Sequence, residues 1–208
     1  MSKIKEGMLI VLSGPSGSGK GTIIKSLLEK RQDTVLSISM TTRDPRIGEQ
    51  EGVHYFFRTR EEFEQTIANN GFLEYAEYNG NYYGTPLAPI RRWLYEGKNV
   101  ILEIEVQGAE RVMENYKDHV SIFLAVPSVE ELERRLRGRG TESDEVIARR
   151  MDAAKRELAR ADHYQYIVLN DEVEQAVERI NAIINAEDMR YARMKNTVLE
   201  VLDHVSTE

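Results

Sequence analysis

The sequence has no cysteine, a single tryptophan and five prolines, and its apolar residues never form a long run. Without cysteine the chain has neither disulfides nor thiolate metal sites, a composition that is compatible with a reducing compartment. The apolar run nearest the N-terminus, Met8–Leu12, is too short for a signal peptide or a membrane span. We therefore expect a soluble cytoplasmic protein without a membrane segment.

Basic residues are outnumbered by acidic ones. The chain has 28 Lys and Arg against 35 Asp and Glu, which gives a net charge of -7 at pH 7. This balance argues against a protein that coats nucleic acid, so any polyanion has to meet a local basic pocket. Hydrophobic residues make up 41% of the 208 residues, enough for one domain with a sizeable core and an inserted lobe.

Short apolar runs alternate with segments of helical pattern. The first run, 8–12, is continuous, as expected of a buried parallel strand, and a helical spacing of apolar residues follows it from Ile23 to Leu28. Similar runs, each followed by a helical pattern, lie at 99–106, 120–126 and 164–169. The last helical pattern, from 171 to 194, predicts a single long helix. This order predicts an α/β fold with a mostly parallel sheet and helices on both faces.

Residues 36–90 have a different character. Two aromatic-rich runs resemble short strands, a turn signal stands at Asn79-Gly80, and a helical pattern lies between the runs. We interpret this segment as an α+β lobe inserted between the first helix and the next core strand.

A glycine-rich loop stands between the first strand and the first helix. Its residues are Gly14, Pro15, Ser16, Gly17, Ser18, Gly19, Lys20, Gly21 and Thr22. In such a loop the backbone N–H groups and the helix N-terminus face phosphate oxygens, and Lys20 reaches the β- and γ-phosphates. A flexible Gly/Ser turn is the alternative, but nothing about a turn requires Lys20. We therefore predict that these nine residues bind ATP.

The position after Gly-Lys usually carries a Ser or Thr hydroxyl that holds magnesium, whereas here Gly21 occupies it and the hydroxyl comes at Thr22. An enzyme that binds two nucleotides can hold Mg²⁺ through phosphate oxygens and water instead, because this ion keeps several waters. The Gly-Lys-Gly-Thr sequence resembles the loop of nucleoside monophosphate kinases. It points to phosphoryl transfer between nucleotides, with Mg²⁺ accompanying ATP.

Three further motifs extend the resemblance. They are Ser-x-Thr-Thr-Arg-x-Pro-Arg-x-Gly-Glu from Ser39, Gly-Asn-Tyr-Tyr-Gly-Thr from Gly80 and Gly-Arg-Gly-Thr-Glu from Gly138. Together with the loop, in this order over about residues 7 to 190, they resemble guanylate kinase of the bacterial type. The resemblance implies a P-loop NTPase core, a GMP-binding lobe and a small lid. It implies transfer of phosphate from ATP to GMP, and to dGMP, in purine nucleotide metabolism, with nucleotides as partners and a homo-oligomer left open.

The resemblance also assigns residues to GMP. It gives the GMP phosphate to Arg43, Arg46, Tyr55 and Tyr83, and the guanine to Ser39, Glu74, Thr85 and Glu105. Two arginines and two phenols are the donors that a dianionic phosphate needs, although tyrosines on a strand also serve as packing. Glu74 is the first choice for the carboxylate that accepts the N1–H and N2 amine of guanine.

Glu103 and Glu105 alternate at the end of the predicted strand 99–106, where open α/β sheets bind ligands. We expect Glu103 to face magnesium-bound water and Glu105 to face guanine. The family more often has aspartates here, and a solvent-facing carboxylate is the alternative.

The arginines after residue 133 fall into two groups. Arg134, Arg135 and Arg137 each follow a glutamate by four, which predicts ion pairs along a helix, including a pair of Glu130 with Arg134. The resemblance places Arg139 in the lid and Arg150 on the next helix, over the transferring phosphoryl group. Positive charge there stabilises the transition state, so we expect Lys20, Arg139 and Arg150 to be catalytic.

These assignments give one domain over 1–208. Its core would span 7–35 and 90–190, its GMP-binding lobe 36–90, its lid about 137–145 and a helical tail 190–208. Two alternatives stay open. One is a kinase of AMP, and the other is a scaffold domain related to guanylate kinase that binds phosphopeptides without catalysis, which would not need the intact loop and Lys20.

Overall fold

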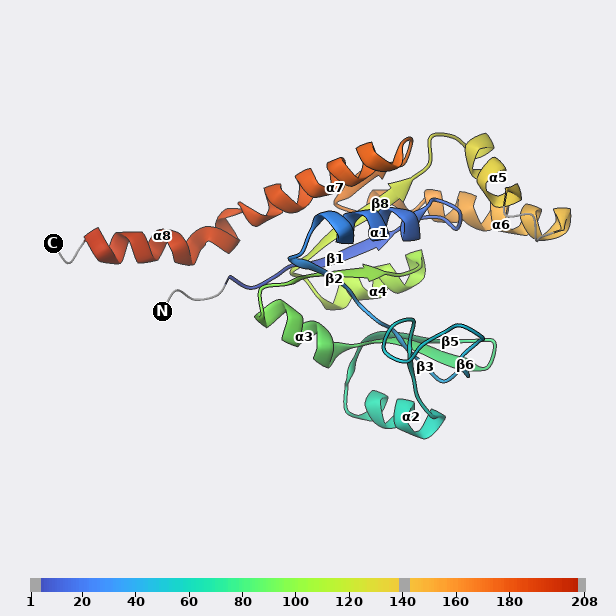
Figure 1. The fold of residues 1–208 in the computed structure, drawn as a ribbon, viewed down its shortest axis with the longest axis horizontal. Coiled ribbons are helices and arrows are strands. Elements are labelled where there is room, and N and C mark those ends of the chain that lie inside the picture. The colour runs from blue at the N-terminus through green and yellow to red at the C-terminus, as the bar shows by residue number, and fades with distance from the viewer. Residues whose placement is uncertain (1–4, 139–142, 206–208) are drawn as a thin grey trace.

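The computed structural model describes residues 5–138 and 143–205. Its centre is a parallel sheet of five strands in the order β2-β7-β1-β8-β9 (Figure 1). The strands are β1 (Leu9–Ser13), β2 (Thr34–Leu36), β7 (Asn99–Glu103), β8 (His119–Ala125) and β9 (Tyr166–Leu169). The predicted α/β architecture with a parallel core is confirmed.

Helices cover both faces of this sheet. On one face α1 (Lys20–Lys30) and α7 (Val173–Asp188) pack against Met8, Ile10 and Leu12. On the other, α3 (Leu87–Tyr95) and α4 (Val106–Asn115) pack against Leu9 and Val11. Because both faces are buried, β1 is apolar at every position up to Ser13, whose side chain is buried as well.

A second sheet of four strands forms the lobe, in the order β4-β3-β6-β5. Its elements are β3 (Met40–Thr41), β4 (Phe56–Phe57), α2 (Arg60–Ala68), β5 (Phe72–Tyr78) and β6 (Asn81–Pro86). Asn79 and Gly80 have φ values of 49° and 76°, the left-handed conformations of a tight hairpin between β5 and β6. Phe63 of α2 stacks on Phe72 with ring centroids 4.3 Å apart and forms the lobe's own small core.

Helices α5 (Val129–Arg137) and α6 (Asp144–Leu158) form an arm at the upper right of Figure 1, whereas the lobe lies below the central sheet. The arm has a separate apolar cluster in which Leu132 and Leu136 face Ile147 and Met151. No helix of the described residues is long and apolar enough to cross a membrane.

Two predicted elements have different ends. The strand predicted over 99–106 stops at Glu103, and Glu105 is the N-cap of α4. Val106 belongs to the buried face of the helix with Ala109 and Val112, a spacing of three that the strand prediction overlooked. The alternation of Glu103 and Glu105 is therefore not that of a strand.

The single long helix predicted after residue 171 is wrong, because α7 ends at Asp188 and α8 (Tyr191–Val205) begins after Arg190. The Lys5 ammonium donates to the Asp188 carbonyl at 2.8 Å and so caps the last residue of α7. The core contacts of α7 also end nearby, at Ile184 and Glu187. Strand β2 and helix α3 were not anticipated, since β2 has three residues and proline usually ends a helix, although Pro89 is tolerated in the first turn of α3.

The predicted pair of Glu130 with Arg134 is also wrong. At the start of α5 the Ser128 hydroxyl accepts from the backbone N–H of Glu131 at 3.1 Å, and Glu130 is in the exposed first turn. Arg134 turns instead to Glu131 at 2.7 Å, and Glu131 binds Arg135 at the same distance. The predicted pair of Arg137 with Glu133 is present at 2.8 Å.

Candidate active site

The glycine loop connects β1 to α1 at the carboxyl edge of the sheet. Gly14, Gly17 and Gly19 have φ values of 149°, 90° and 92°, which other residues rarely adopt. A Cβ on Gly14 would lie 2.4 Å from the carbonyl oxygen of Leu124. Glycine is therefore required at Gly14 by the backbone of the neighbouring strand as well as by conformation.

Lys20 opens helix α1 and folds back over the loop. Its Nζ donates to the carbonyl oxygens of Gly14 at 2.6 Å and Pro15 at 3.3 Å. No side chain caps the start of α1, because Gly19 is the N-cap. The first N–H groups of the helix are therefore available to bind an anion, and the positive end of the helix and the Lys20 ammonium lie beside them.

Three side chains from other elements contact the loop. Asn170, which follows β9, donates from Nδ2 to the Ser18 carbonyl at 2.7 Å. Arg135 of α5 donates to the same carbonyl at 3.3 Å and to that of Asn170 at 2.9 Å. Arg150 of α6 donates to the Ser16 hydroxyl at 2.6 Å. The loop is thus attached to the sheet and to both helices of the arm.

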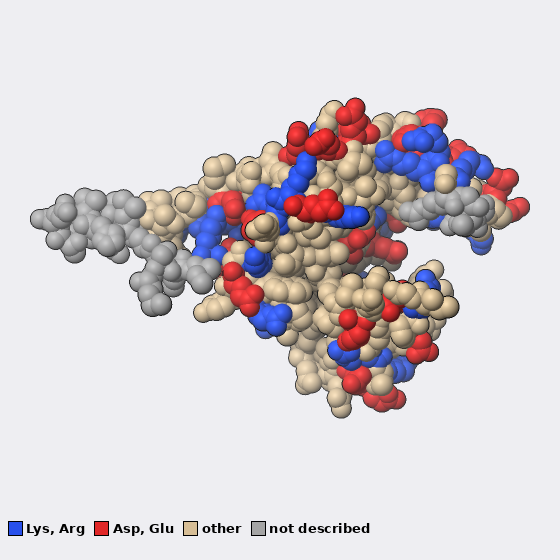
Figure 2. Space-filling view, viewed as in Figure 1, with Lys and Arg blue, Asp and Glu red and all other residues tan. Residues whose placement is uncertain are grey.

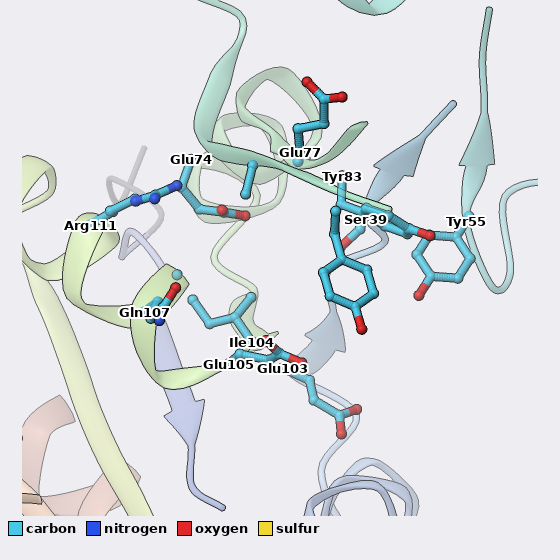
Figure 3. A pocket seen from close by; sticks show the side chains of 14 residues that line it. Ser39, Tyr55, Glu74, Glu77, Tyr83, Glu103, Ile104, Glu105, Gln107 and Arg111 are labelled. Atoms are coloured by element: carbon cyan, nitrogen blue, oxygen red, sulfur yellow. The ribbon is translucent and has the colours of Figure 1, made fainter. Parts of the chain in front are cut away.

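A cavity of about 430 Å³ lies between the lobe and the core (Figure 3). Its lining residues are Ser39, Tyr55, Glu74, Ala76, Glu77, Tyr78, Tyr83, Gly84, Glu103, Ile104, Glu105, Gln107, Gly108 and Arg111. In Figure 3 Tyr83 extends from the lobe toward the side where Glu103 and Glu105 lie. Figure 2 shows the hollow between the arm and the lobe, with acidic side chains along its core side.

Glu74 and Thr85 are cross-strand partners in the lobe. The Thr85 hydroxyl donates to Glu74 Oε1 at 2.7 Å. Burial raises the pKa of Glu74, while the Thr85 hydroxyl and the charge of Arg111 act in the opposite direction. Arg111 is anchored by a 2.9 Å bond to the Tyr75 carbonyl. The carboxylate thus keeps a second oxygen, Oε2, near the first turn of α4, where a Cβ on Gly108 would lie 3.6 Å from it.

Two of the three tyrosines that line the cavity, Tyr55 and Tyr83, lie beside an arginine. The rings of Tyr55 and Tyr83 are 6.1 Å apart, and the Arg43 guanidinium lies 5.5 Å from the Tyr55 ring centroid. Arg43 makes two 2.9 Å bonds to Glu49, which hold the pKa of Glu49 at about 2. Arg46 is exposed, and its backbone N–H also bonds to Glu49. This corner of the lobe holds cationic and phenolic donors together.

Glu103 lies between the cavity and the loop. Glu103 is the register partner of Leu12, two residues before Gly14, so it lies beside the start of the loop. Burial raises the pKa of this carboxyl, and the charge of Lys20 acts in the opposite direction. The cavity and the phosphate-type loop therefore form one continuous site. Among residues 5–138 and 143–205 no group of three or more His, Asp or Glu side chains is arranged to hold a metal ion.

Residues 6–187 match the protein-family model of guanylate kinase. The chain belongs to the guanylate kinase family. It is 53% identical to a guanylate kinase of Clostridium perfringens over 95% of this chain and 92% of that one. It is 52% identical to the Lactococcus lactis guanylate kinase over 97% and 98% of the two chains. The crystal structure of guanylate kinase from Anaplasma phagocytophilum superposes with a TM-score of 0.72 at 36% identity, covering 91% of this chain and 90% of that one.

Within this guanylate kinase fold the site residues expected from the sequence fall into three sets. Ser39, Tyr55, Glu74, Tyr83, Glu103 and Glu105 line the cavity. In the second set, Thr85 bonds to Glu74, Arg43 lies over the Tyr55 ring, Arg46 is exposed on the lobe, and Lys20 and Arg150 contact the glycine loop. Arg139, together with residues 140–142 of the expected lid, lies outside the described residues.

Several residues of the site were missed from the sequence. Asn170 directly follows a core strand, so the rule that ligands bind at the carboxyl edge would have found it. Arg135 was interpreted only as the ion-pair partner of Glu131, four residues earlier, and it does contact that residue. Gln107 and Arg111 follow the acidic pair on α4, a helix whose start was placed one residue too late.

Proposed function

We infer that this guanylate kinase transfers the γ-phosphoryl group of ATP to GMP, giving ADP and GDP. The observation that carries the inference is the Glu74 and Thr85 pair in a cavity that adjoins a glycine loop and Lys20. The relatives named guanylate kinase match this chain over nearly their whole length. The same site would accept dGMP, and the reaction recycles purine monophosphates.

The guanine would bind against Glu74. Guanine presents two donors on one edge, N1–H and the N2 amine, and one carboxylate can accept both. Ser39 and Thr85 supply hydroxyls, and Glu105 is a second acceptor for the amine. Adenine presents an acceptor at N1, which would face the carboxylate and leave a charge unpaired.

The GMP phosphate would bind among Arg43, Arg46, Tyr55 and Tyr83. A dianionic phosphate would replace Glu49 as the partner of Arg43, and the phenols would add single donors. The acceptor oxygen is already an anion, so no general base is required. Catalysis then consists of alignment and of positive charge around the transferring group, from Lys20, Arg139 and Arg150.

The ATP phosphates would bind along the loop, from Gly14 to Thr22, with Mg²⁺ as the accompanying ion. The side chains at the loop fit a magnesium ion that would contact the protein through bound water. Gly21 has no hydroxyl, while Glu103 is a carboxylate close to Lys20 and able to bind a magnesium-bound water. When bound, the ion would neutralise charge on the phosphates.

We also propose that the lobe is residues 36–90, the lid about 137–145, and that the enzyme works in the cytoplasm, where ATP and GMP are available.

We further propose that the chain forms a homo-oligomer through α8. This helix extends away from the core (Figure 1) and exposes Tyr191, Val198 and Leu199. Light scattering of the full chain and of one ending at Arg190 tests it, with the larger mass expected only for the full chain.

The decisive test of function is ADP release with ATP plus GMP, dGMP, AMP, UMP or CMP. Rapid turnover with GMP and dGMP alone is expected. Rapid turnover with AMP would replace the guanine assignment by a kinase of AMP. Absence of turnover with every acceptor, in a folded protein, would favour the non-catalytic scaffold alternative.

A further inference from the structure

Strand β5 carries Glu74, the carboxylate that we assign to guanine, and it is the last strand of the lobe sheet. One edge of β5 pairs with β6, and among residues 5–138 and 143–205 no strand lies at its other edge. Such an edge presents backbone carbonyl groups that need donors from elsewhere. The Tyr75 carbonyl, one residue after Glu74, has its donor in the core, because Arg111 Nη1 of α4 donates to it at 2.9 Å. This bond joins lobe and core beside the guanine carboxylate.

Helix α4 also carries the core side of the acceptor site. Glu105 is its N-cap, and Gln107, Gly108 and Arg111 of the helix line the cavity together with Glu105. A Cβ on Gly108 would lie 3.6 Å from Glu74 Oε2, so the first turn of α4 lies directly beside that carboxylate. One helix therefore has one carboxylate of the site at its start and holds the strand that carries the other.

The Arg111 side chain crosses the boundary between core and lobe. In Figure 3 it extends from α4 toward the strand that carries Glu74. A guanidinium has five N–H donors and no acceptor, so it is suited to a strand carbonyl and repels none of the acceptors around it. Burial raises the pKa of Glu74, and the positive charge of Arg111 acts in the opposite direction. Arg111 thus holds the strand and favours the ionised carboxylate that guanine requires.

We propose that Arg111 is a positioning residue for guanine recognition, which ties β5 to α4 and so keeps the carboxylates of Glu74 and Glu105 at one spacing. The N2 amine of guanine needs both carboxylates, and its N1–H needs Glu74. Arg111 acts through these two groups and has no part in the transfer of the phosphoryl group. The proposal rests on the proposed function, because it takes the cavity as the site of GMP.

A residue that positions the guanine site changes one kinetic constant and leaves the others. Arg111→Met removes the charge and every donor but keeps an apolar stem. Loss of one hydrogen bond from a charged donor should raise the KM for GMP about 3- to 10-fold. The values of kcat and of the KM for ATP should stay within about twofold, because Arg111 is on the acceptor side of the site. Arg111→Lys keeps a positive charge and a donor, so it should recover most of the affinity for GMP.

The experiment measures GMP binding by calorimetry, together with kcat, both KM values and the melting temperature. It compares wild type, Arg111→Met and Arg111→Lys with Arg92→Met, a matched control at an exposed arginine of α3 that does not line the cavity. Weaker GMP binding in Arg111→Met alone, at an unchanged kcat, is the expected result. Unchanged GMP binding in Arg111→Met, a loss that Arg111→Lys does not recover, or an equal rise of both KM values would overturn the proposal.

A double-mutant cycle separates positioning from an independent contact. Because Arg111 acts through Glu74, Arg111→Met should weaken GMP binding in the wild type but change it less than about twofold in the Glu74→Gln background. Equal losses in the two backgrounds would overturn the proposal. Binding of GMP to the wild type is measured first. Absence of that binding would count against the proposed function, whereas binding that Arg111→Met leaves unchanged would count only against the role of Arg111.

Discussion

At the scale of single residues, the guanine recognition that we propose depends on one half-buried carboxylate, that of Glu74. Glu74 has its Oε1 fixed by Thr85 at 2.7 Å, which leaves Oε2 for a ligand. Replacing this carboxylate by an amide puts an N–H donor against the donors of guanine. A mismatch of this kind costs about 1–3 kcal/mol, more where a charge is involved.

Glu74→Gln is therefore expected to raise the KM for GMP strongly and to narrow the preference for GMP over AMP. The KM for ATP should change little, because Glu74 is on the acceptor side of the site. Steady-state kinetics with both acceptors measure this. If the variant discriminates as the wild type does, Glu105 becomes the residue to test.

The same carboxylate predicts a pH dependence. Burial raises the pKa of Glu74 above its ordinary value of 4.5, and guanine needs the ionised form. The KM for GMP should therefore rise as pH falls through that raised pKa. Burial of the ionised carboxylate costs stability above this pKa, and the cost disappears below it. KM measured against pH in wild type and in Glu74→Gln checks this, because the variant should keep only the dependence that belongs to the nucleotide phosphate.

At the scale of elements, the glycines of the loop differ in whether a larger residue would fit in their place. Gly14 has a φ of 149° and faces the Leu124 carbonyl, so a methyl group there would collide with β8. Gly21 lies in the first turn of α1, and a Cβ there would meet nothing within 4 Å. Two glycines of one loop thus offer a matched pair of substitutions.

Gly14→Ala should destabilise the protein by about 1–3 kcal/mol and raise the KM for ATP, because the loop has to shift. Gly21→Ala should keep activity and stabilise the protein by about 0.5–1 kcal/mol, since alanine favours helix. Urea unfolding and ATP kinetics measure both effects. Severe loss of activity in folded Gly21→Ala would show that the position after Lys20 needs glycine for a reason other than conformation.

The elements also show how far sequence reasoning reaches. The loop, the α1 pattern and the lobe hairpin were predictable because glycine, helical spacing and Asn-Gly act locally. Glu103 was placed correctly at the end of the strand, whereas Glu105 was misplaced because Val106 fits a strand as well as a helix, and here it begins α4. The contact of Arg150 with the Ser16 hydroxyl could not be predicted from the local pattern of α6, because it joins residues far apart in the chain.

At the scale of the whole molecule, the lobe and the arm face one another across the hollow seen in Figure 2. The chain passes between the core and the lobe at two places, residues 37–39 between β2 and β3 and Pro86 between β6 and α3, and Arg111 of α4 also bonds to the Tyr75 carbonyl of the lobe. The arm has its own apolar cluster, separate from the two clusters of the main sheet. Such short connections between separately packed bodies are typical of hinges.

Closure of this hollow is the last prediction. Two anionic nucleotides have to be brought together and water excluded, because water would otherwise accept the phosphoryl group. With a bisubstrate analogue that links adenosine and guanosine through phosphates, small-angle scattering should give a smaller radius of gyration than for the free protein. ATP alone should produce less compaction, since the lobe closes on the acceptor through Glu74 and the tyrosines. Identical scattering with and without the analogue would mean that the lobe is fixed and that the site works in the open arrangement.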